Sequence, residues 1–433
     1  MIIDFTVSNF RSIMTEQTFS MFAENPASHL LGNIVYPADS KVGVLKCAGI
    51  YGANASGKSN LLRAFMALRY IICFSGDLKE GDAIPCYEPY LLSEDSKSAP
   101  VRFEVEFFTP DNRQYKYVVS FTKEKIIEEY LGFYPSAKQA SIFSREKNDT
   151  WDTISFGTLY KGGKKRHSLF ENNAYVSIAG NKADSPQLIR NVYNYFRKEM
   201  LCLGCDQHIV YTELYDEKNR LEKVAAFLSL VDTGIAGIKS KENADIDKII
   251  FPKNMPDKIR NSIIRQEKTK YLFSHKTDVG GMENFDLDQE SSGTQKLFEL
   301  APVLIDALES GGVLVLDELD NSMHPFMAEL ILKLFNDEEV NTNGAQLIFS
   351  THNINLMSPE IFRRDQIWFT EKNDGTTTFY SLEDFDKKEV KPKSPFNRWY
   401  AEGRFGGVPK IDYKGVVDLF IASREDDAKD KKN

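Results

Sequence analysis

The octapeptide GANASGKS, residues 52 to 59, constrains this chain of 433 residues more than any other stretch. It fits the pattern G-x-x-x-x-G-K-[ST], and it lies between the apolar run VLKCAGIY and the helix-like run NLLRAFMALRYIICF. The pattern needs a strand, a tight loop and a helix in that order, and the sequence offers all three. The octapeptide therefore predicts a loop that holds phosphate. The alternative is a chance glycine-rich turn.

Each residue type in this loop has a predicted task. Gly52 and Gly57 let the backbone curl until its N–H groups point inward, and the following helix presents its positive dipole end to the same anion. Lys58 would reach the β and γ phosphates of a nucleotide, and the Ser59 hydroxyl would ligate Mg²⁺. The predicted binding residues of the loop are Gly52, Ala53, Asn54, Ala55, Ser56, Gly57, Lys58, Ser59 and Asn60.

Composition and charge limit the class of protein in which this loop occurs. Hydrophobic residues make up 42% and charged residues 27% of the chain, as in an ordinary soluble protein, and no run approaches the roughly 20 apolar residues of a membrane span. The start MIIDFTVSNFRSI alternates like a strand, which favours a cytoplasmic protein without a targeting segment. A net charge of −9 argues against a surface that is basic all over. The densest basic cluster, KGGKKRH at 161–167, is more typical of a solvated turn.

The cysteines favour buried, reduced thiols over a metal site. Cys202 and Cys205 lie close together in LCLGCDQH, where His208 would be a third ligand. A tetrahedral zinc site needs four ligands, so this segment alone would not complete one.

The order of strand and helix patterns predicts an α/β fold with a β-rich N-terminal lobe. The runs IIDFTVSNF, VLKCAGIY, PVRFEVEFF, QYKYVVSF and IIEEYLGFY favour strands, several of them antiparallel neighbours. From about Ser185 the pattern becomes helical, without the heptads of a long coiled coil. We expect four segments: the N-terminal part of the core with the loop and an antiparallel lobe at 1–184, a compact helical insertion and connector at 185–285, the C-terminal part of the core at 286–425, and a disordered tail at 426–433.

A second motif supplies carboxylates. GGVLVLDELDNSMHP, residues 311 to 325, begins with four apolar residues that predict a buried parallel strand ending in Asp317 and Glu318. Open α/β sheets place their ligands at the carboxyl ends of such strands. Asp317 would hold Mg²⁺, and Glu318 would polarise the attacking water. An ordinary polar strand end or a helix-start signal is the alternative.

Two further pieces narrow the class. AQLIFSTHNINLM, residues 345 to 357, predicts another buried strand, and His352 at its end could sense the γ-phosphate or position water. DQESSGTQKLFELAPVLIDAL predicts a long amphipathic helix, with Ser292 and Gly293 as an anion nest at its start. On its own, the histidine would more often be structural, and the serine-glycine start would be only a helix cap.

In this order, the motifs resemble the ATPase heads of the ABC superfamily, above all those related to the SMC, Rad and RecF repair proteins. ESSGTQ is similar to the family signature L-S-G-G-Q at Ser292, Gly293 and Gln295, and departs from it at Ser291 and Thr294. The run NFRS, residues 9 to 12, is similar to a strand end whose arginine approaches the nucleotide, which implies a supporting role for Arg11. His324 and Pro325 occupy a loop in which transporter heads carry an aspartate.

The missing coiled-coil arm and the segment PFNRWYAEGRFGGVPKI, residues 395 to 411, look like the compact AAA-15 or abortive-infection ATPases of prokaryotes, including RloA-type and PARIS ATPase subunits. The resemblance implies an ATP- and Mg²⁺-dependent ATPase that forms nucleotide-sandwich dimers. It also implies an antiphage switch that controls a separate effector, such as a nuclease, in response to a phage-encoded trigger. The alternatives are a RecF-like repair ATPase that binds DNA directly and a nucleotide-held scaffold with negligible turnover.

Overall fold

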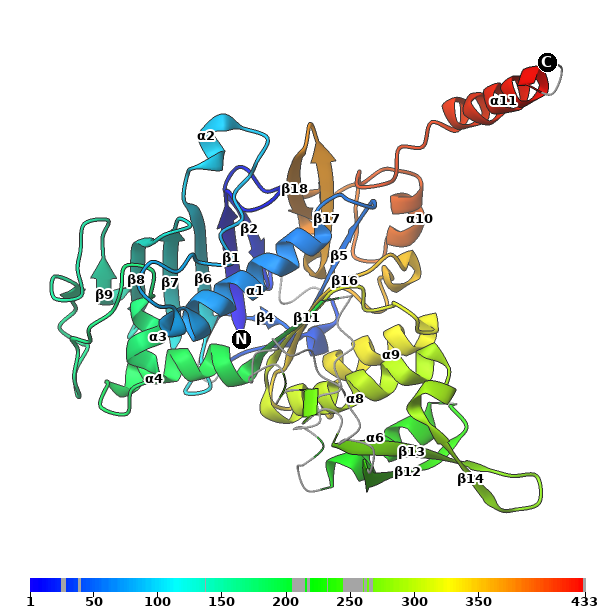
Figure 1. Ribbon diagram of the computed structural model, residues 1–433, viewed down its shortest axis with the longest axis horizontal. Coiled ribbons are helices and arrows are strands. Elements are labelled where there is room, and N and C mark those ends of the chain that lie inside the picture. The colour runs from blue at the N-terminus through cyan, green and yellow to red at the C-terminus, as the bar shows by residue number, and fades with distance from the viewer. Residues whose placement is uncertain are drawn as a thin grey trace.

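Four sheets and a set of flanking helices form the computed structural model (Figure 1). The structure describes residues 1–24, 29–37, 40–136, 138–204, 215, 219–231, 233–243, 260, 263–264 and 268–430. Two of the sheets are large, and helix α1 (Lys58–Phe74) lies between them.

The N-terminal lobe is an antiparallel sheet of seven strands. Its order is β10 (Ser155–Phe156), β9 (Ala140–Arg145), β8 (Ile126–Phe133), β7 (Gln114–Phe121), β6 (Val101–Phe108), β1 (Ile2–Ser8) and β2 (Gln17–Ser20). Inward and outward residues alternate along β1 and β6, the pattern of a sheet with one face on the core. The β-rich lobe and its antiparallel pairs are therefore confirmed.

The central sheet carries the predicted motifs. Its order is β11 (Met200–Leu203), β15 (Val313–Leu316), β16 (Gln346–Ser350), β5 (Cys47–Gly52), β17 (Ile367–Asn373) and β18 (Thr376–Ser381). The first five strands are parallel, and β18 turns back along β17. The phosphate loop and the Asp-Glu and Ser-Thr-His motifs thus follow three neighbouring strands at the same sheet edge.

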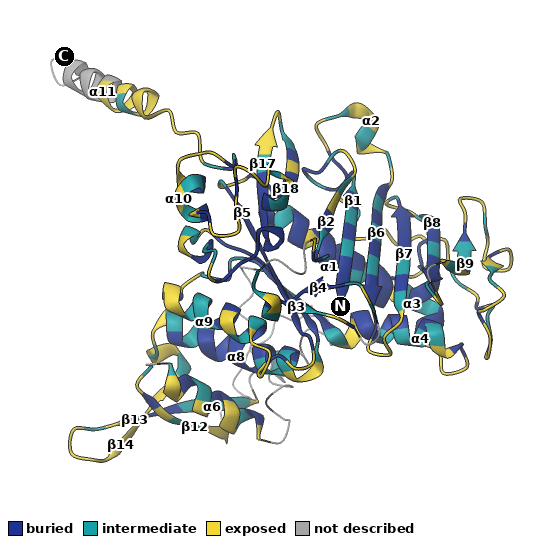
Figure 2. Ribbon diagram, turned by 180° about the vertical axis from the view of Figure 1, so that it is seen from behind, coloured by how far each residue is buried: buried dark blue, intermediate teal, exposed yellow. Residues whose placement is uncertain are grey.

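Both faces of the central sheet are covered, which explains why its strands read as continuous apolar runs. Ala48 and Ile50 belong to the core on the α1 side, whereas Cys47 and Tyr51 belong to the core on the other face. That second face is covered by α8 (Ser292–Ser310) and α9 (Pro325–Asn336). The inner strands β5, β15 and β16 are buried at every residue, whereas the end of β17 is exposed (Figure 2).

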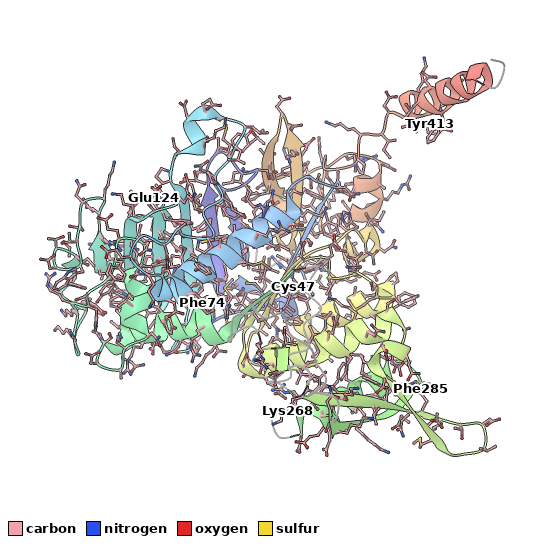
Figure 3. The ribbon with its side chains drawn as sticks, viewed as in Figure 1. Cys47, Phe74, Glu124, Lys268, Phe285 and Tyr413 are labelled. Atoms are coloured by element: carbon pink, nitrogen blue, oxygen red, sulfur yellow. The ribbon has the colours of Figure 1, made fainter. Side chains whose placement is uncertain are left out.

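The segment 185–285 contributes strands as well as helices. It begins with α4 (Gln187–Asn194) and a π-helical turn, and then supplies β11 to the central sheet. Where we expected a connector, the described residues form α6 (Arg220–Leu230) and a sheet of β12 (Ile235–Glu242), β13 (Thr269–Lys276) and β14 (Met282–Asp286). Phe285 lies on the outlying hairpin of this sheet (Figure 3). Cys202 lies in β11, and Cys205 and His208 lie outside the described residues.

The remaining elements are short or peripheral. They are β3 (Ile34–Val35), β4 (Val44–Leu45), α2 (Glu94–Lys97), α3 (Tyr175–Gly180), α10 (Phe396–Ala401) and α11 (Tyr413–Asp430). Helix α11 stands away from the body and runs into the segment 426–433, for which the sequence predicts a disordered tail (Figure 1). Across the described part of the chain, none of the helices is long and apolar enough to cross a membrane, and no long coiled coil is present.

Candidate functional site

The loop between β5 and α1 is the centre of the candidate site. Gly52 and Gly57 have φ angles of 156° and 114°, and a Cβ on Gly57 would lie 2.3 Å from Oγ1 of Thr377. Both positions therefore require glycine, for conformational and for steric reasons. Ala55 also has a positive φ angle of 60°, at the tip of the loop.

A chain of hydroxyl groups fastens this loop to the neighbouring strands. Oγ of Ser56 lies 2.6 Å from Oγ1 of Thr370 on β17, and Thr377 on β18 donates to the Ser56 carbonyl at 2.8 Å. The Thr377 hydroxyl also lies 2.7 Å from that of Ser12, which accepts from Asn60 Nδ2 at 2.6 Å. The sequence analysis missed Ser12, Thr370 and Thr377, because hydroxyl residues are ordinary in strands and turns.

Lys58 is buried at the base of the loop. Its Nζ donates to the carbonyls of Gly52 at 2.9 Å and Ala53 at 3.2 Å. Burial lowers the pKa of Lys58, and the carboxylates of Asp317, Glu318 and Asp320 act in the opposite direction. The structure thus brings the lysine of the first motif into the electrostatic field of the carboxylates of the second.

The two carboxylates after β15 are held by the end of β16. The Ser350 hydroxyl donates to Oδ1 of Asp317 at 2.5 Å and accepts from the Glu318 backbone N–H at 2.8 Å. Asp317 is buried, and the half-buried Glu318 has a positive φ angle of 55°, which is uncommon for a residue with a side chain. Ser350 fixes the direction of Asp317, a role that the sequence motif Ser-Thr-His did not indicate.

His352 and Asp320 complete this edge of the sheet. His352 is largely open to solvent, but partial desolvation of its ring, followed by the charge of Lys58, lowers its pKa, so its neutral form is favoured. Asp320, which the sequence analysis missed, accepts a hydrogen bond from the Thr351 hydroxyl at 2.5 Å. His324 has a different place, because it is the N-cap of α9 and its Nδ1 accepts from the Phe326 N–H at 3.3 Å.

Arg11 lies on the other side of the helix start. Asn9 and Arg11 both have positive φ angles, which fold the NFRS segment into a tight turn. The Arg11 guanidinium pairs with Glu88 at 3.2 Å. Arg11, Ser12 and Asn60 line a cavity of about 510 Å³, together with residues 87–92, Lys372 and Gly375.

The start of α8 differs from the phosphate loop at the start of α1 in its hydrogen bonds and exposure. Ser291 is the N-cap of α8, since its hydroxyl accepts from the Thr294 N–H at 3.2 Å, whereas Ser292 is exposed. Gly293 faces the loop that follows Glu318, because a Cβ there would lie 3.0 Å from the Ser322 carbonyl oxygen. Gln295 donates to the Glu290 carbonyl at 2.8 Å. Within the described residues, no hydrogen bond joins this turn to the phosphate loop.

A second cavity, of about 550 Å³, opens at the tip of the phosphate loop. It is lined by Tyr51, Gly52, Ala53, Asn54, Thr351, His352, Ile354, Tyr400, Pro409 and Lys410. The residues present fit a bound triphosphate, since glycines leave room for it, a lysine stands at its base and strand-end carboxylates stand beside it. Ser59 and Asp317 supply the hydroxyl and carboxylate oxygens that Mg²⁺ prefers.

Comparison with known proteins gives the following likenesses. The chain is similar to the SMC head domain from Thermotoga maritima, at 15% identity and a TM-score of 0.40, over 88% of this chain and 98% of that one. It is similar to RecF with ATP, at 12% identity and a TM-score of 0.38, over 88% and 99%. It is also similar to the Smc head of Pyrococcus furiosus bound to the C-terminal domain of ScpA, at 12% and 0.37, over 88% and 96%. Comparison with curated proteins found no significant match.

One family covers the candidate site directly. The family described as "AAA domain, putative AbiEii toxin, Type IV TA system" matches residues 47–358, more than half of the chain. The match begins with β5 and ends after His352, so it contains the phosphate loop, the start of α8 and the Asp-Glu motif. The chain therefore belongs to this family of AAA domains.

Proposed function

We propose that this chain binds ATP with Mg²⁺ at the phosphate loop, hydrolyses it and uses it to hold two protomers together. One observation carries the proposal. The carboxyl ends of β5, β15 and β16 lie side by side, and they place Lys58, the carboxylates of Asp317 and Glu318, and His352 within mutual electrostatic reach. A buried lysine opposite strand-end carboxylates is the arrangement that phosphoryl transfer to water needs.

Each side chain has a task in this proposal. Ser59 and Asp317 would hold Mg²⁺, which neutralises charge on the β and γ phosphates when bound. Ser350 keeps Asp317 in a single orientation. Glu318 would accept the proton of the attacking water, and its positive φ angle is of the uncommon kind that clusters at functional sites. Neutral His352 can both donate and accept a hydrogen bond near the γ-phosphate.

The nucleoside would lie in the cavity of Arg11 and Asn60. This cavity borders the first turn of α1, and its walls combine aromatic and aliphatic side chains with Arg11 and Lys372. Pockets for nucleotides have such apolar walls with a few polar groups that fix orientation. Arg11 would support the phosphates from that side.

The second protomer enters through the start of α8. Ser292 is exposed and is not needed as the cap, because Ser291 has that role. A serine hydroxyl and free N–H groups at a helix start are suited to a phosphate that another copy presents. ATP would then join two protomers, and hydrolysis would loosen them, which makes a two-state switch.

For the biological role, we propose an antiphage or abortive-infection module in which this switch controls a separate effector, such as a nuclease, in response to a phage-encoded trigger. The family description, which names the AbiEii toxin and a type IV toxin-antitoxin system, supports this setting.

The proposal is tested by measuring phosphate release and molecular mass for the purified chain with ATP, ADP and no nucleotide. We expect turnover with Mg²⁺ and ATP, and a larger assembly with ATP than with ADP. Assembly without phosphate release would indicate a scaffold. A strongly salt-dependent affinity for duplex DNA would instead favour a repair ATPase that loads on nucleic acid, because phosphate contacts release counterions. Co-purification with the product of the neighbouring gene tests the effector.

A further inference from the structure

The segment 399–410, which begins in the last turn of α10, lines part of the cavity at the tip of the phosphate loop. Tyr400, Pro409 and Lys410 line this cavity of about 550 Å³ together with Asn54 and His352. The loop residues come from the N-terminal part of the chain, and the wall formed by residues 399–410 comes from its C-terminal part. These residues have no role in the function proposed above.

Hydrogen bonds and ring contacts within the protein hold the segment 399–410 in place. The Tyr400 hydroxyl donates to the Gly407 carbonyl at 2.9 Å, and the Tyr380 hydroxyl donates to the Phe405 carbonyl at 2.7 Å. Phe405 is buried against Phe369, with ring centroids 5.6 Å apart. These contacts hold the segment in place before a nucleotide arrives.

Two glycines turn the wall against the phosphate loop. Gly406 and Gly407 have φ angles of 69° and 65°, a conformation that favours glycine. A Cβ on Gly407 would lie 3.7 Å from the Gly52 Cα and 3.4 Å from the Thr370 carbonyl oxygen, so this turn packs directly on the first residue of the phosphate loop. The next three residues then lead to Lys410 at the mouth of the cavity.

The described lining residues of this cavity offer an anion a cation and no carboxylate, although Asp320 accepts a hydrogen bond from Thr351 in the lining. Among the described residues that line it, none is a carboxylate, and Lys410 is the lysine. Lys410 is 82% exposed, and its described ion pair is with Glu371, at 3.6 Å. An exposed pair of this length is weak, so Lys410 can exchange this partner for a phosphate oxygen at little cost.

We propose that Lys410 is a further nucleotide-binding residue, which contacts the terminal phosphate of a nucleoside triphosphate from the C-terminal wall. This inference rests on the proposed function, since it takes the phosphate loop to hold a triphosphate. Lys58 approaches that triphosphate from the base of the loop and Lys410 from its open side. Lys410 therefore distinguishes ATP from ADP, whereas Lys58 serves both.

The test measures the dissociation constants of ATP and ADP by calorimetry, with all variants in a Glu318→Gln background that keeps ATP intact. Lys410→Ala should raise the Kd of ATP by about 10-fold or more, the scale of one lost charge-assisted hydrogen bond, and that of ADP by less than about 2-fold. Lys410→Arg should retain most of the affinity for ATP, and Lys410→Glu should lose more than alanine does. The matched control is Lys414→Glu, which changes an exposed lysine four residues further along the chain, in α11, and should leave both constants unchanged.

Two further variants separate the outcomes. Glu371→Gln removes the partner of Lys410 and should leave ATP affinity equal or tighter. A weaker affinity there, an equal loss for ATP and ADP in Lys410→Ala, or a Kd of ATP unchanged in Lys410→Ala would each overturn this inference. Lys58→Ala must lose both nucleotides. If it binds them as the parent does, the proposed function fails, and if only Lys410→Ala is silent, the inference alone fails.

Discussion

The chain contains two glycine-bearing helix starts, and they are built in opposite ways. At the start of α1, the phosphate loop is tied to β17 and β18 by hydroxyl groups, and Lys58 is buried beside carboxylates. At the start of α8, Ser292 is exposed, and the hydrogen bonds described at that turn join near neighbours in sequence.

The difference indicates which parts of the proposed nucleotide site one protomer supplies and which part needs a second protomer. In the function proposed above, the first helix start, with its lysine and strand-end carboxylates in place, would bind a nucleotide within a single protomer. The second offers an exposed hydroxyl and helix N–H groups without a cation or carboxylate of the site beside them. We propose that it acts on a phosphate that a second molecule presents.

The largest effect is expected from Lys58→Ala, which changes the phosphate loop at the start of α1. It removes the side-chain charge of the phosphate loop, so we expect ATP affinity to fall about 100-fold or more, with turnover lost, since each hydrogen bond to a charged group contributes about 1.5–3 kcal/mol. The fold should stay intact, because the hydrogen bonds described for Lys58 go to carbonyls of its own loop. Calorimetry with ATP measures this, and Arg63→Ala, an exposed cation on the same helix, is the control. Unchanged affinity in the lysine variant would refute the assignment of the loop.

Glu318→Gln separates binding from chemistry on the same side. The amide keeps the shape of the side chain and loses its basicity, so turnover should drop by about 10²-fold or more while ATP still binds and holds protomers together. Phosphate release and molecular mass with ATP measure the two effects. Glu329→Gln, a surface change in α9 that removes an ion pair with Lys333, should alter neither. Turnover at the parental rate would mean that another residue positions the water.

The strands and the helix that carry the phosphate loop could be predicted because their sequence signals are local. The loop pattern, the apolar run before Asp317 and the alternation in β1 and β6 each lie within about ten residues and report burial directly. The antiparallel lobe and the parallel core could therefore be predicted.

What the sequence did not show depends on contacts between distant segments. Thr370 and Thr377 reach Ser56 across more than 300 residues, and a threonine in a strand is too common to indicate a role. Asp320 and Ser350 gain their roles only because β15 and β16 end side by side. The sheet of β12, β13 and β14 was not predicted, because its segment is rich in Lys, Asp and Asn. The alternation of the buried residues Tyr271 and Phe273 along β13 was the available strand signal.

Ser292→Arg tests whether the exposed helix start acts on a second copy. Each protomer should still bind ATP at its own loop, yet the bulky cation should prevent the closed assembly and abolish turnover. Mixing this variant with Lys58→Ala, each inactive alone, gives hetero-dimers in which one of two composite sites is intact. If dimers form at random, about a quarter of the parental turnover should return. No recovery in mixtures shown to contain hetero-oligomers would contradict a shared site.

The smallest effect is expected at the start of α8, where the adjacent residues Ser291 and Ser292 have different expected roles. Ser291→Ala removes the cap of α8 and should cost about 1 kcal/mol, seen as a lower unfolding midpoint, with turnover nearly intact. Ser292→Ala should leave the midpoint nearly unchanged, because its hydroxyl is exposed, and should lower turnover if that hydroxyl contacts the partner's phosphate. A stability loss in both variants with normal turnover in both would reduce this turn to a structural cap. In that case the second protomer would have to complete the site through some other surface.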